Sequence, residues 1–431
     1  MSDEDCGILE HSGLHLRPDP SRTVLRPFDP TYPDAYADEE HPRVRNVVDR
    51  VLQMDEAEAK ALGDAIARSL AERHRDVETV LARRFDDVAR QVAGAARASP
   101  AQRLVIGAYL LQEYSFEAAA LFNPSMVLHP DQTALPDGAI RFILSLRGIG
   151  EGHVSSVTFR LGTWSAAQGF AVEDGSPMAT SPRIEGSPED DGAVTVAFEN
   201  SRGVSERIFF PIAPSQRQGI EDMRLVRFTD DDGHADYYGT YTAFDGRTAR
   251  SEMMRRTERD TFEMRPLRGK AAAYKGMALF PRRVAGRFHM LGRMDSESIW
   301  LLASDDLWCW EGGAKLVQPR YPWEFVQMGN CGSPIEIDEG WLVLTHGVGM
   351  VRNYCVGACL LDRDDPSKLL ARTAKPLLRP SPGERDGYVP NVVYSCGGIV
   401  HDRTLLLPYG ISDNFATFAT CSVDALLAAM E

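Results

Sequence analysis

The chain has 431 residues, of which 43% are hydrophobic and 25% are charged, which is the composition of a soluble globular protein with a sizeable core. At this length a single compact domain is expected only for a barrel or a propeller. The formal net charge of −15 argues against a general nucleic-acid binder, which would need a basic face.

The N-terminus and the cysteines indicate the compartment. The first residues, MSDEDCGILEHSG, are acidic and lack the apolar stretch of a secretory signal. No apolar run reaches the ~18 residues that a membrane helix needs. The seven cysteines are scattered, which favours reduced thiols, and the ten histidines show no metal-ligand spacing. We therefore expect a cytoplasmic protein without a metal and without membrane contact.

The first part of the chain predicts helices. Residues 1 to about 40 are Pro-rich and irregular, and we expect them to wrap over a surface. Between residues 44 and 98 apolar side chains recur at helical spacing, as do Val80, Leu81, Phe85, Val88 and Val92. The string SPAQRLVIGAYLLQEYS begins with a Ser-Pro start signal and predicts one more helix. Residues 1–115 are thus expected to form an N-terminal irregular and helical extension.

The apolar stripe over residues 76–98 has two possible partners. It could hold together a homo-oligomer through the N-terminal helices, or it could pack back on the strand-rich remainder of the chain. The sequence leaves both possibilities open.

From Ala118 onward the pattern changes to short strands between Gly, Pro, Asp and Asn turns, for example IRFILSLR, ADYYGTYTAF and GWLVLTHG. More than a dozen strands over ~310 residues exceed one open sheet and indicate a sandwich, barrel or propeller. About five four-stranded blades would fit this length. The predicted fold class is all-β, with a five-bladed β-propeller over residues 116–431 behind the helical extension.

The run GIEDMRLVRF places two carboxylates, Glu221 and Asp222, beside Arg224 at the start of a predicted strand. Many sugar-cleaving sites hold a proton donor in this way. Acidic residues at strand ends are often only solvated turn residues, and the run alone leaves that interpretation open. Polar clusters at other strand ends, NCGSPIE, LTHGVG and LPYGISD, favour a functional site.

Several of these strings together resemble glycoside hydrolase family 130. The likeness is carried in unbroken order by FNPSMVL, FILSLRGIGEGHVSSVTFR, GIEDMRLVRF, KGMALFPRRV, MGNCGSPIEIDEGWLVLTHGVG, ERDGYVPNVVYSCG and LLPYGISD, over roughly residues 117–427. The best known members are β-mannoside phosphorylases acting on mannosyl-glucose and β-1,4-mannooligosaccharides, and their fold is a five-bladed β-propeller. The helical extension resembles that of the branch acting on mannooligosaccharides, where it contributes to oligomer contacts.

The resemblance implies that Asp222 is the catalytic acid. An inverting phosphorylase needs one proton donor and no general base, because phosphate is already an anionic nucleophile, unlike the water of ordinary inverting hydrolases. In the family the proton is thought to pass through a mannose hydroxyl. We expect burial or a neighbouring charge to raise the pKa of Asp222, with Glu221 supplying the charge or binding the sugar. Met223 stands where the family motif has proline, which loosens this turn.

The resemblance also implies a phosphate-binding cluster formed by Lys275, Arg293 and His346. Arginine grips phosphate oxygens with a fork and lysine as a point charge. Other branches have a lysine where this chain has Gln327, and Arg352 and Tyr354 are expected to fill that gap. For each basic residue alone, a surface ion pair is the commoner role, so the prediction depends on the whole set.

The mannose unit is expected to bind to Asn123, Arg147, Glu221 and Asp413. Further candidates near the site are His153, Ser155 and Ser156. The aromatic residues Trp323, Tyr354 and Tyr388 could stack on sugar rings or pack in the core. Inorganic phosphate is expected as a co-substrate, and no cofactor is implied.

These features predict an inverting β-mannoside phosphorylase, a glycosyltransferase of the glycoside phosphorylase type. It would convert a β-1,4-mannooligosaccharide and phosphate to α-mannose 1-phosphate and a shortened sugar. An inverting β-mannoside hydrolase on the same fold is the first alternative, favoured weakly by Gln327 and disfavoured by the retained basic cluster. A noncatalytic propeller that binds glycans or proteins is the second, and the retained Asp222 disfavours it.

Overall fold

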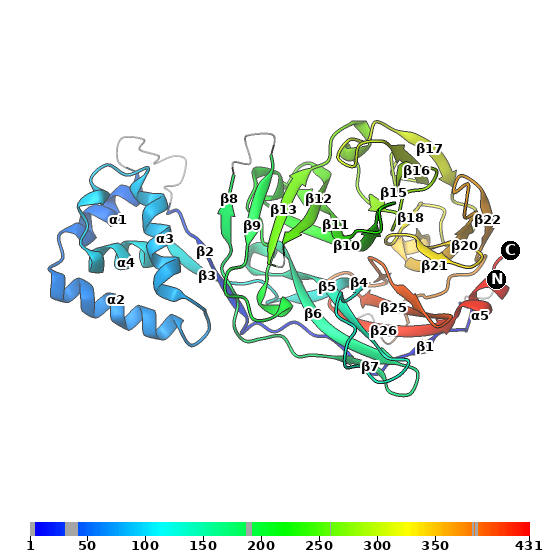
Figure 1. The fold of residues 1–431 in the computed structure, drawn as a ribbon, viewed down its shortest axis with the longest axis horizontal. Helices are drawn as coiled ribbons and strands as arrows, with labels where there is room; N and C mark the ends of the chain where they lie inside the picture. Colours follow the sequence, from blue (N-terminus) through cyan, green and yellow to red (C-terminus); the bar gives the residue numbers. More distant parts are fainter. Residues whose placement is uncertain (1–4, 31–41, 187–191, 259, 382, 384–386) are drawn as a thin grey trace.

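The computed structural model describes the chain except for residues 1–4, 31–41, 187–191, 259, 382 and 384–386. Helices gather at one end of the molecule and strands form the rest, so the described protein is mostly β (Figure 1). A two-stranded ribbon of β2 (Thr23–Pro27) and β3 (Leu111–Ser115) joins the two parts.

The helical part consists of α1 (Arg43–Leu52), α2 (Glu56–Leu70), α3 (Val77–Ala89) and α4 (Pro100–Tyr109). The Ser-Pro signal does start α4: Ser99 and Gln102 form a reciprocal capping box, and Pro100 occupies the first turn. The helix is shorter than predicted, because the chain from Leu111 pairs with β2 instead. This pairing buries Tyr114 against Val24, which outweighs the helical pattern of the sequence.

The apolar stripe forms the core of the helical part itself. Phe85, Val88 and Val92 pack with residues of α1 and α4, whereas Val80 and Leu81 pack near α2 and β2. Helix α4 approaches α3 so closely that a Cβ on Gly107 would lie 2.1 Å from the carbonyl oxygen of Leu81. The sequence anticipated neither this packing nor its partners. Self-association through the N-terminal helices stays a prediction, and the stripe no longer supports it.

The N-terminal segment is less irregular than predicted. Strand β1 (Glu10–His11) pairs with β26 (Phe415–Ser422), and β2 follows it, so the segment adds to the last sheet before it reaches the helices. The two ends of the predicted surface wrap, residues 1–4 and 31 to about 40, lie outside the described residues. Between β1 and β2, the buried Arg22 forms an ion pair with the equally buried Glu117, which also pairs with Arg160.

The largest sheet in the described chain has ten strands: β4 (Ala120–Leu128), β5 (Ile140–Ile149), β6 (Ser155–Ser165), β7 (Gly169–Val172), β8 (Arg183–Glu185), β9 (Val194–Ala197), β10 (Gly219–Thr229), β11 (Ala235–Phe244), β12 (Ala249–Glu258) and β13 (Thr261–Pro266). It divides into two antiparallel groups, β4–β7 and β8–β13. A single parallel pair, Gly219 with Ser155, joins them.

Three further sheets follow along the described chain, each antiparallel. The first contains β14 (Ala278–Leu279), β15 (Phe288–Gly292), β16 (Ile299–Ser304) and β17 (Gly313–Val317). The second contains β18 (Gln327–Asn330), β19 (Ile335–Ile337), β20 (Gly340–Val348), β21 (Tyr354–Leu361) and β22 (Leu369–Arg372). The last contains β23 (Val393–Tyr394), β24 (Ile399–His401), β25 (Thr404–Ile411) and β26 with β1, and α5 (Val423–Ala428) follows it. The described strands therefore form five consecutive groups besides the ribbon.

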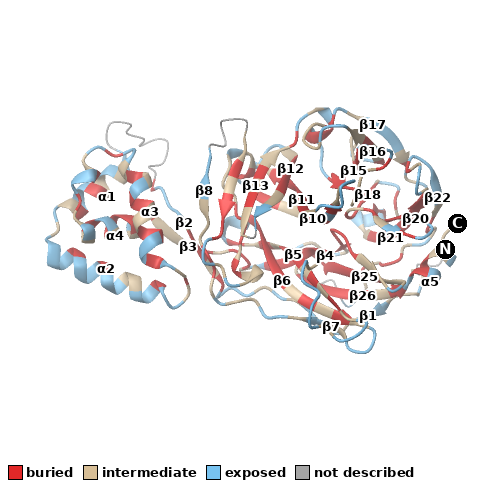
Figure 2. Ribbon diagram, viewed as in Figure 1, coloured by how far each residue is buried: buried red, intermediate tan, exposed pale blue. Residues whose placement is uncertain are grey.

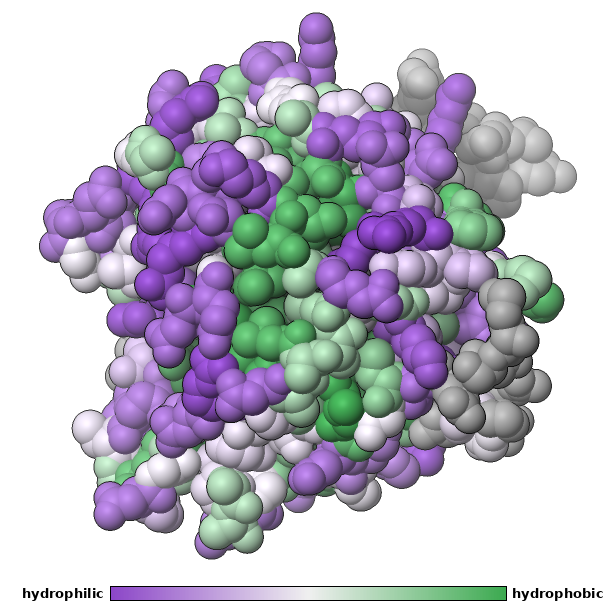
Figure 3. Space-filling model, turned by 90° about the vertical axis from the view of Figure 1, so that its right-hand side faces the viewer, coloured by the Kyte–Doolittle hydropathy of each residue, from purple (hydrophilic) through white to green (hydrophobic). Residues whose placement is uncertain are grey.

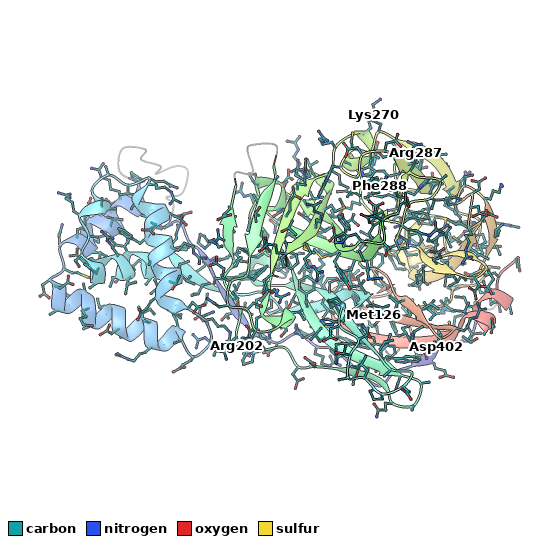
Figure 4. The ribbon with its side chains drawn as sticks, in the orientation of Figure 1. Met126, Arg202, Lys270, Arg287, Phe288 and Asp402 are labelled. Carbon is teal, nitrogen blue, oxygen red and sulfur yellow. The ribbon has the colours of Figure 1, made fainter. Side chains whose placement is uncertain are left out.

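Neighbouring groups share hydrophobic cores. Buried residues of adjacent groups cluster together, and Figure 2 shows the buried positions in red along the strands. One of these cores joins the first and last groups, because Phe142 and Met126 pack with Leu406 and Phe418 (Met126 is labelled in Figure 4). Strands at the two ends of the strand-rich region thus lie side by side.

The face of the molecule at its strand-rich end is not uniformly polar. Hydrophobic side chains form a central band there, flanked by hydrophilic areas (Figure 3). In the part of the chain that the structure describes, no helix is long and apolar enough to cross a membrane.

Candidate functional site

The side chains that the sequence singles out lie around one cavity of about 560 Å³. Each of the five strand groups contributes at least one of them. The lining includes all the predicted site residues, namely Asn123, Arg147, Glu221, Asp222, Lys275, Arg293, His346, Arg352, Tyr354 and Asp413. The structure therefore brings together residues that are up to 290 positions apart in the sequence, 413 minus 123.

Local backbone irregularities turn key side chains toward this cavity. Asn123 and Asp222 lie at shifts of register in the β4–β5 and β10–β11 pairings, with φ of 48° and 50°. Asp413 also has a left-handed φ of 50°. Such bulges re-aim a side chain away from the regular face of a strand, and Asn and Asp tolerate this conformation best. Met223, which replaces proline, is buried against Gly239, so packing supports the bulge.

Arg147 holds both carboxylates of the Glu-Asp pair. Its Nη1 donates to Oδ1 of Asp222 at 3.2 Å, and its Nη2 donates to Oε1 of Glu221 at 3.0 Å. Its Nε donates to the hydroxyl of Ser155 at 2.9 Å. Asn123 donates a further hydrogen bond from Nδ2 to Oδ1 of Asp222 at 2.7 Å. The pair is therefore a fixed part of the cavity wall and not a solvated turn.

The two aspartates of the cavity have opposite pKa shifts. Burial raises the pKa of Asp222, but the charges of Arg147 and Arg224 and the hydrogen bond from Asn123 outweigh it, so the pKa lies below its ordinary value. The predicted upward shift of the Asp222 pKa is thus wrong for this structure. Burial raises the pKa of Asp413 to about 6, aided by the negative charge of Asp222.

The basic residues form another part of the lining. Lys275 donates from Nζ to Oε2 of Glu221 at 3.1 Å. Nη1 of Arg293 lies 3.4 Å from Nε2 of His346. Because arginine has only donors, Nε2 of the histidine is the acceptor. Burial and then the charge of Arg293 keep the pKa of His346 well below its ordinary value, so the ring is neutral. The buried Nε of Arg293 has no hydrogen-bond partner among the described residues.

Two glycines leave the space that the side chains of Arg293 and His346 occupy. A Cβ on Gly276, whose φ is +87°, would lie 2.9 Å from Nε of Arg293. A Cβ on Gly329 would lie 2.5 Å from Cδ of Arg293 and 2.6 Å from Cε1 of His346. A side chain at position 329 would displace Arg293 and His346, and one at position 276 would press on Arg293.

Arg352 and Tyr354 do line the cavity, as does Gln327, which stands where other family branches have lysine. The guanidinium of Arg352 lies 5.7 Å from the ring centroid of Tyr354. The Tyr354 ring stacks nearly parallel to His346, with centroids 6.3 Å apart. Arg352 and Tyr354 therefore line the same cavity as Gln327 and the neutral His346, and their replacing the lysine stays a prediction.

Sequence reasoning missed Tyr394 as a site residue and gave Arg224 no role. Tyr394 lines the cavity, and the buried Arg224 donates from Nη2 to its hydroxyl at 3.0 Å. Both residues stand in strings that carry the family resemblance, GIEDMRLVRF and NVVYSCG. Their place in those strings was the available signal, because a buried arginine looks like any strand residue in the sequence.

The remaining candidates fall into two classes. The ring of His153 stacks on Tyr388 at 5.7 Å, Tyr388 is 72% exposed, and the adjacent Val389 lines the cavity. Trp323 instead packs against the backbone of Gly347 and donates to a backbone carbonyl, which is a core role. Among the described residues, no group of His, Cys, Asp or Glu is arranged to hold a metal ion.

A family model described as beta-1,4-mannooligosaccharide phosphorylase matches residues 183–431 of the chain. Over 206 residues the chain is 36% identical to the 1,2-beta-oligomannan phosphorylase of Thermoanaerobacter sp. (strain X514), covering 46% of this chain and 66% of that protein. Over 160 residues it is 33% identical to the beta-1,4-mannooligosaccharide phosphorylase of Ruminococcus albus, covering 34% and 47%. The matched segments thus span about half to just under two thirds of these relatives' own length.

Solved structures show a similar fold. The beta-1,2-mannobiose phosphorylase from Listeria innocua, solved with beta-1,2-mannobiose, superposes with a TM-score of 0.51 at 21% identity, over 73% of this chain and 92% of that one. A glycoside hydrolase structure from Bacteroides ovatus gives a TM-score of 0.53 at 20% identity, over 73% and 90%. Because the family model covers more than half of the chain, the protein belongs to glycoside hydrolase family 130, the family of the mannoside phosphorylases.

Proposed function

We propose that the protein is an inverting β-mannoside phosphorylase that converts a β-1,4-mannooligosaccharide and phosphate to α-mannose 1-phosphate and a shortened sugar. The observation that carries this proposal is the composition of the cavity that the predicted residues line. It joins a fixed carboxylate pair to a cluster of donors that includes Lys275, Arg293 and the neutral His346. Phosphorolysis requires such a group of donors to bind the phosphate, whereas hydrolysis has no need of it, so the donor cluster favours phosphate as the nucleophile.

The proposal includes the five-bladed β-propeller. The five consecutive strand groups would be its blades, and the core shared by the first and last groups supports closure of the ring. The cavity is lined by residues of all five groups, as expected for a site at the centre of such a fold.

In the proposed reaction, a phosphate oxygen forms a bond to the anomeric carbon of the mannosyl unit while the glycosidic C–O bond breaks. Attack from the face opposite the leaving group turns a β-mannoside into an α-phosphate. Lys275, Arg293 and His346 would hold the phosphate, and Asp222 would supply the proton that the leaving oxygen takes up, through a mannose hydroxyl. Fixing the two reactants in one cavity would lower the barrier by making the reaction effectively unimolecular.

Phosphate binding would also prepare the acid. The charge of Lys275 contributes to the low pKa of Asp222 in the structure. A phosphate bound at Lys275 and Arg293 adds negative charge close to the carboxylate and raises its pKa. The proton donor would therefore become competent only when the nucleophile is present.

The binding site for the saccharide is expected to extend beyond the cavity. His153 and the exposed Tyr388 form a stacked pair beside Val389 at the cavity lining, and exposed aromatic faces suit the rings of a longer saccharide. Relatives of this chain act on 1,2-linked and on 1,4-linked substrates, so the linkage belongs in the test. We propose a cytoplasmic location, where inorganic phosphate is available as co-substrate.

The direct test offers β-1,4-mannobiose, β-1,4-mannotriose and β-1,2-mannobiose, each with and without phosphate, and separates the products by chromatography. We expect mannose 1-phosphate only when phosphate is present. Asp222→Asn should lower kcat by about 10²- to 10⁴-fold, the usual contribution of a general acid. Asp305→Asn, an exposed surface variant, serves as the control and should keep full activity.

Two results would count against the proposal. Free mannose released at the same rate without phosphate would make the protein a hydrolase. Sugar binding without turnover of any of the three substrates would favour the noncatalytic propeller.

A further inference from the structure

Arg224 is a buried cation whose guanidinium donates only to buried or backbone acceptors. Only 2% of the residue is exposed. Its Nε donates to the carbonyl oxygen of Cys331 at 2.9 Å, and its Nη1 donates to the carbonyl oxygen of Asp222 at 3.1 Å. Its Nη2 donates to the hydroxyl of Tyr394 at 3.0 Å. All three acceptors are neutral, so the charge of the guanidinium acts on the neighbouring cavity.

This contact fixes the direction of the Tyr394 hydroxyl proton. A guanidinium has only donors, so the tyrosine oxygen must accept from Arg224, and its own proton must point elsewhere. Tyr394 lines the cavity and is 7% exposed. Burial raises its pKa, so the hydroxyl stays protonated at physiological pH. A hydrogen-bond donor is therefore available toward the cavity.

The position of this donor indicates its ligand. The Tyr394 ring lies 5.0 Å from the ring of His346, which contacts Arg293. Tyr394 thus belongs to the part of the cavity where donors gather, and a cluster of donors suits an anion with several acceptor oxygens. The contact from Arg224 further polarises the O–H bond, which makes it a stronger donor.

We propose that Tyr394 donates a hydrogen bond to the bound phosphate and that Arg224 is a positioning residue that sets its orientation. This inference rests on the proposed phosphorylase function. The same guanidinium binds the backbone of the bulge that carries Asp222. Arg224 therefore fixes the acid and the nucleophile-binding hydroxyl relative to each other.

The test compares Tyr394→Phe, which removes the hydroxyl and keeps the ring, with the wild type. We expect the KM for phosphate to rise about 10- to 100-fold, the range for a lost hydrogen bond to a charged group, and the KM for the mannoside to stay within about threefold. Calorimetric titration with inorganic phosphate alone should show the same loss of affinity. Arg224→Lys should raise the phosphate KM in the same direction, because its ammonium cannot hold all three acceptors.

Tyr241→Phe is the matched control. Tyr241 is another buried tyrosine, its hydroxyl donates to Glu252 at 2.9 Å, and it does not belong to the cavity lining. Its loss should leave the phosphate KM unchanged, which separates a general effect of a lost buried hydroxyl from a phosphate contact.

The possible outcomes test this inference separately from the proposed phosphorylase function on which it rests. An active Tyr394→Phe enzyme with unchanged phosphate KM and affinity would overturn the inference and leave the phosphorylase proposal standing. A rise confined to the mannoside KM would also overturn it and would assign the hydroxyl to the sugar. A wild-type protein that neither binds nor consumes phosphate would overturn both.

Discussion

Asp222 and Asp413 share one cavity, yet their surroundings shift their pKa values in opposite directions. Asp222 contacts Arg147 directly, whereas burial dominates the environment of Asp413. Carboxyl groups whose pKa values are pushed apart commonly take different parts in acid catalysis. Under the proposed mechanism, Asp222 has the lowered pKa and needs the phosphate charge to become an acid, which would link proton donation to substrate binding.

The raised pKa of Asp413 predicts a pH dependence of stability. The folded protein keeps this proton up to about pH 6, whereas the unfolded chain releases it near its ordinary pKa of 3.8. Between these values the folded state binds more proton, so stability falls as pH rises from about 4 to about 6. Asp413→Asn should remove this contribution, which urea midpoints measured across this range would show. An unchanged slope in the variant would contradict the assignment.

At the scale of single elements, strand β18 determines how closely Arg293 and His346 approach. Gly329→Ala would place a Cβ 2.5 Å from Arg293 and 2.6 Å from His346, so both must move. Because small misplacements of reacting groups are costly, we expect the KM for phosphate to rise about 10- to 100-fold. Gly203→Ala is the control, since a Cβ there meets nothing within 4 Å. Equal phosphate KM values in the two variants would refute this account of β18.

The alternation of residues in the sequence predicted the strands well, but not their irregularities. Asn123, Asp222 and Asp413 adopt left-handed φ values that no periodic pattern encodes. The early end of α4 was missed for a similar reason, because only pairing with β2 makes Leu111–Ser115 a strand. Local patterns report local preferences, whereas these features depend on contacts with distant strands.

At the scale of the whole molecule, an ionic network ties the N-terminal segment to the strands. Glu117 pairs with both Arg22 and Arg160, and all three side chains are at least nine-tenths buried. Glu117→Gln would leave two buried cations without their counter-charge. We expect a loss of about 3–5 kcal/mol in the free energy of unfolding, measured with urea.

The control for this network is Asp64→Asn, which removes the exposed ion pair with Lys60 on α2. Exposed pairs contribute little, so this variant should lose less than about 1 kcal/mol. If Glu117→Gln were as mild as Asp64→Asn, the network would not secure the N-terminal segment.

The sequence predicted which side chains belong to the site better than it predicted their electrostatic state. The ten residues predicted to bind phosphate, bind mannose or donate the proton all line the cavity, and most of them stand in a motif shared with the family, whereas Trp323 packs in the core. The downward pKa shift of Asp222 was not foreseen, since it arises from Arg147 on β5 and Arg224 acting together. Tyr394 was missed because its contact with Arg224 forms only in the folded chain.

The central claim, that phosphate and not water attacks the mannosyl unit, is tested most directly by isotope labelling. The wild-type protein would act on β-1,4-mannotriose in ¹⁸O-labelled water with excess phosphate, and mass spectrometry would follow the released mannosyl product. The account predicts mannose 1-phosphate that carries no ¹⁸O. Free mannose with ¹⁸O at its anomeric carbon, formed as the first product, would contradict it.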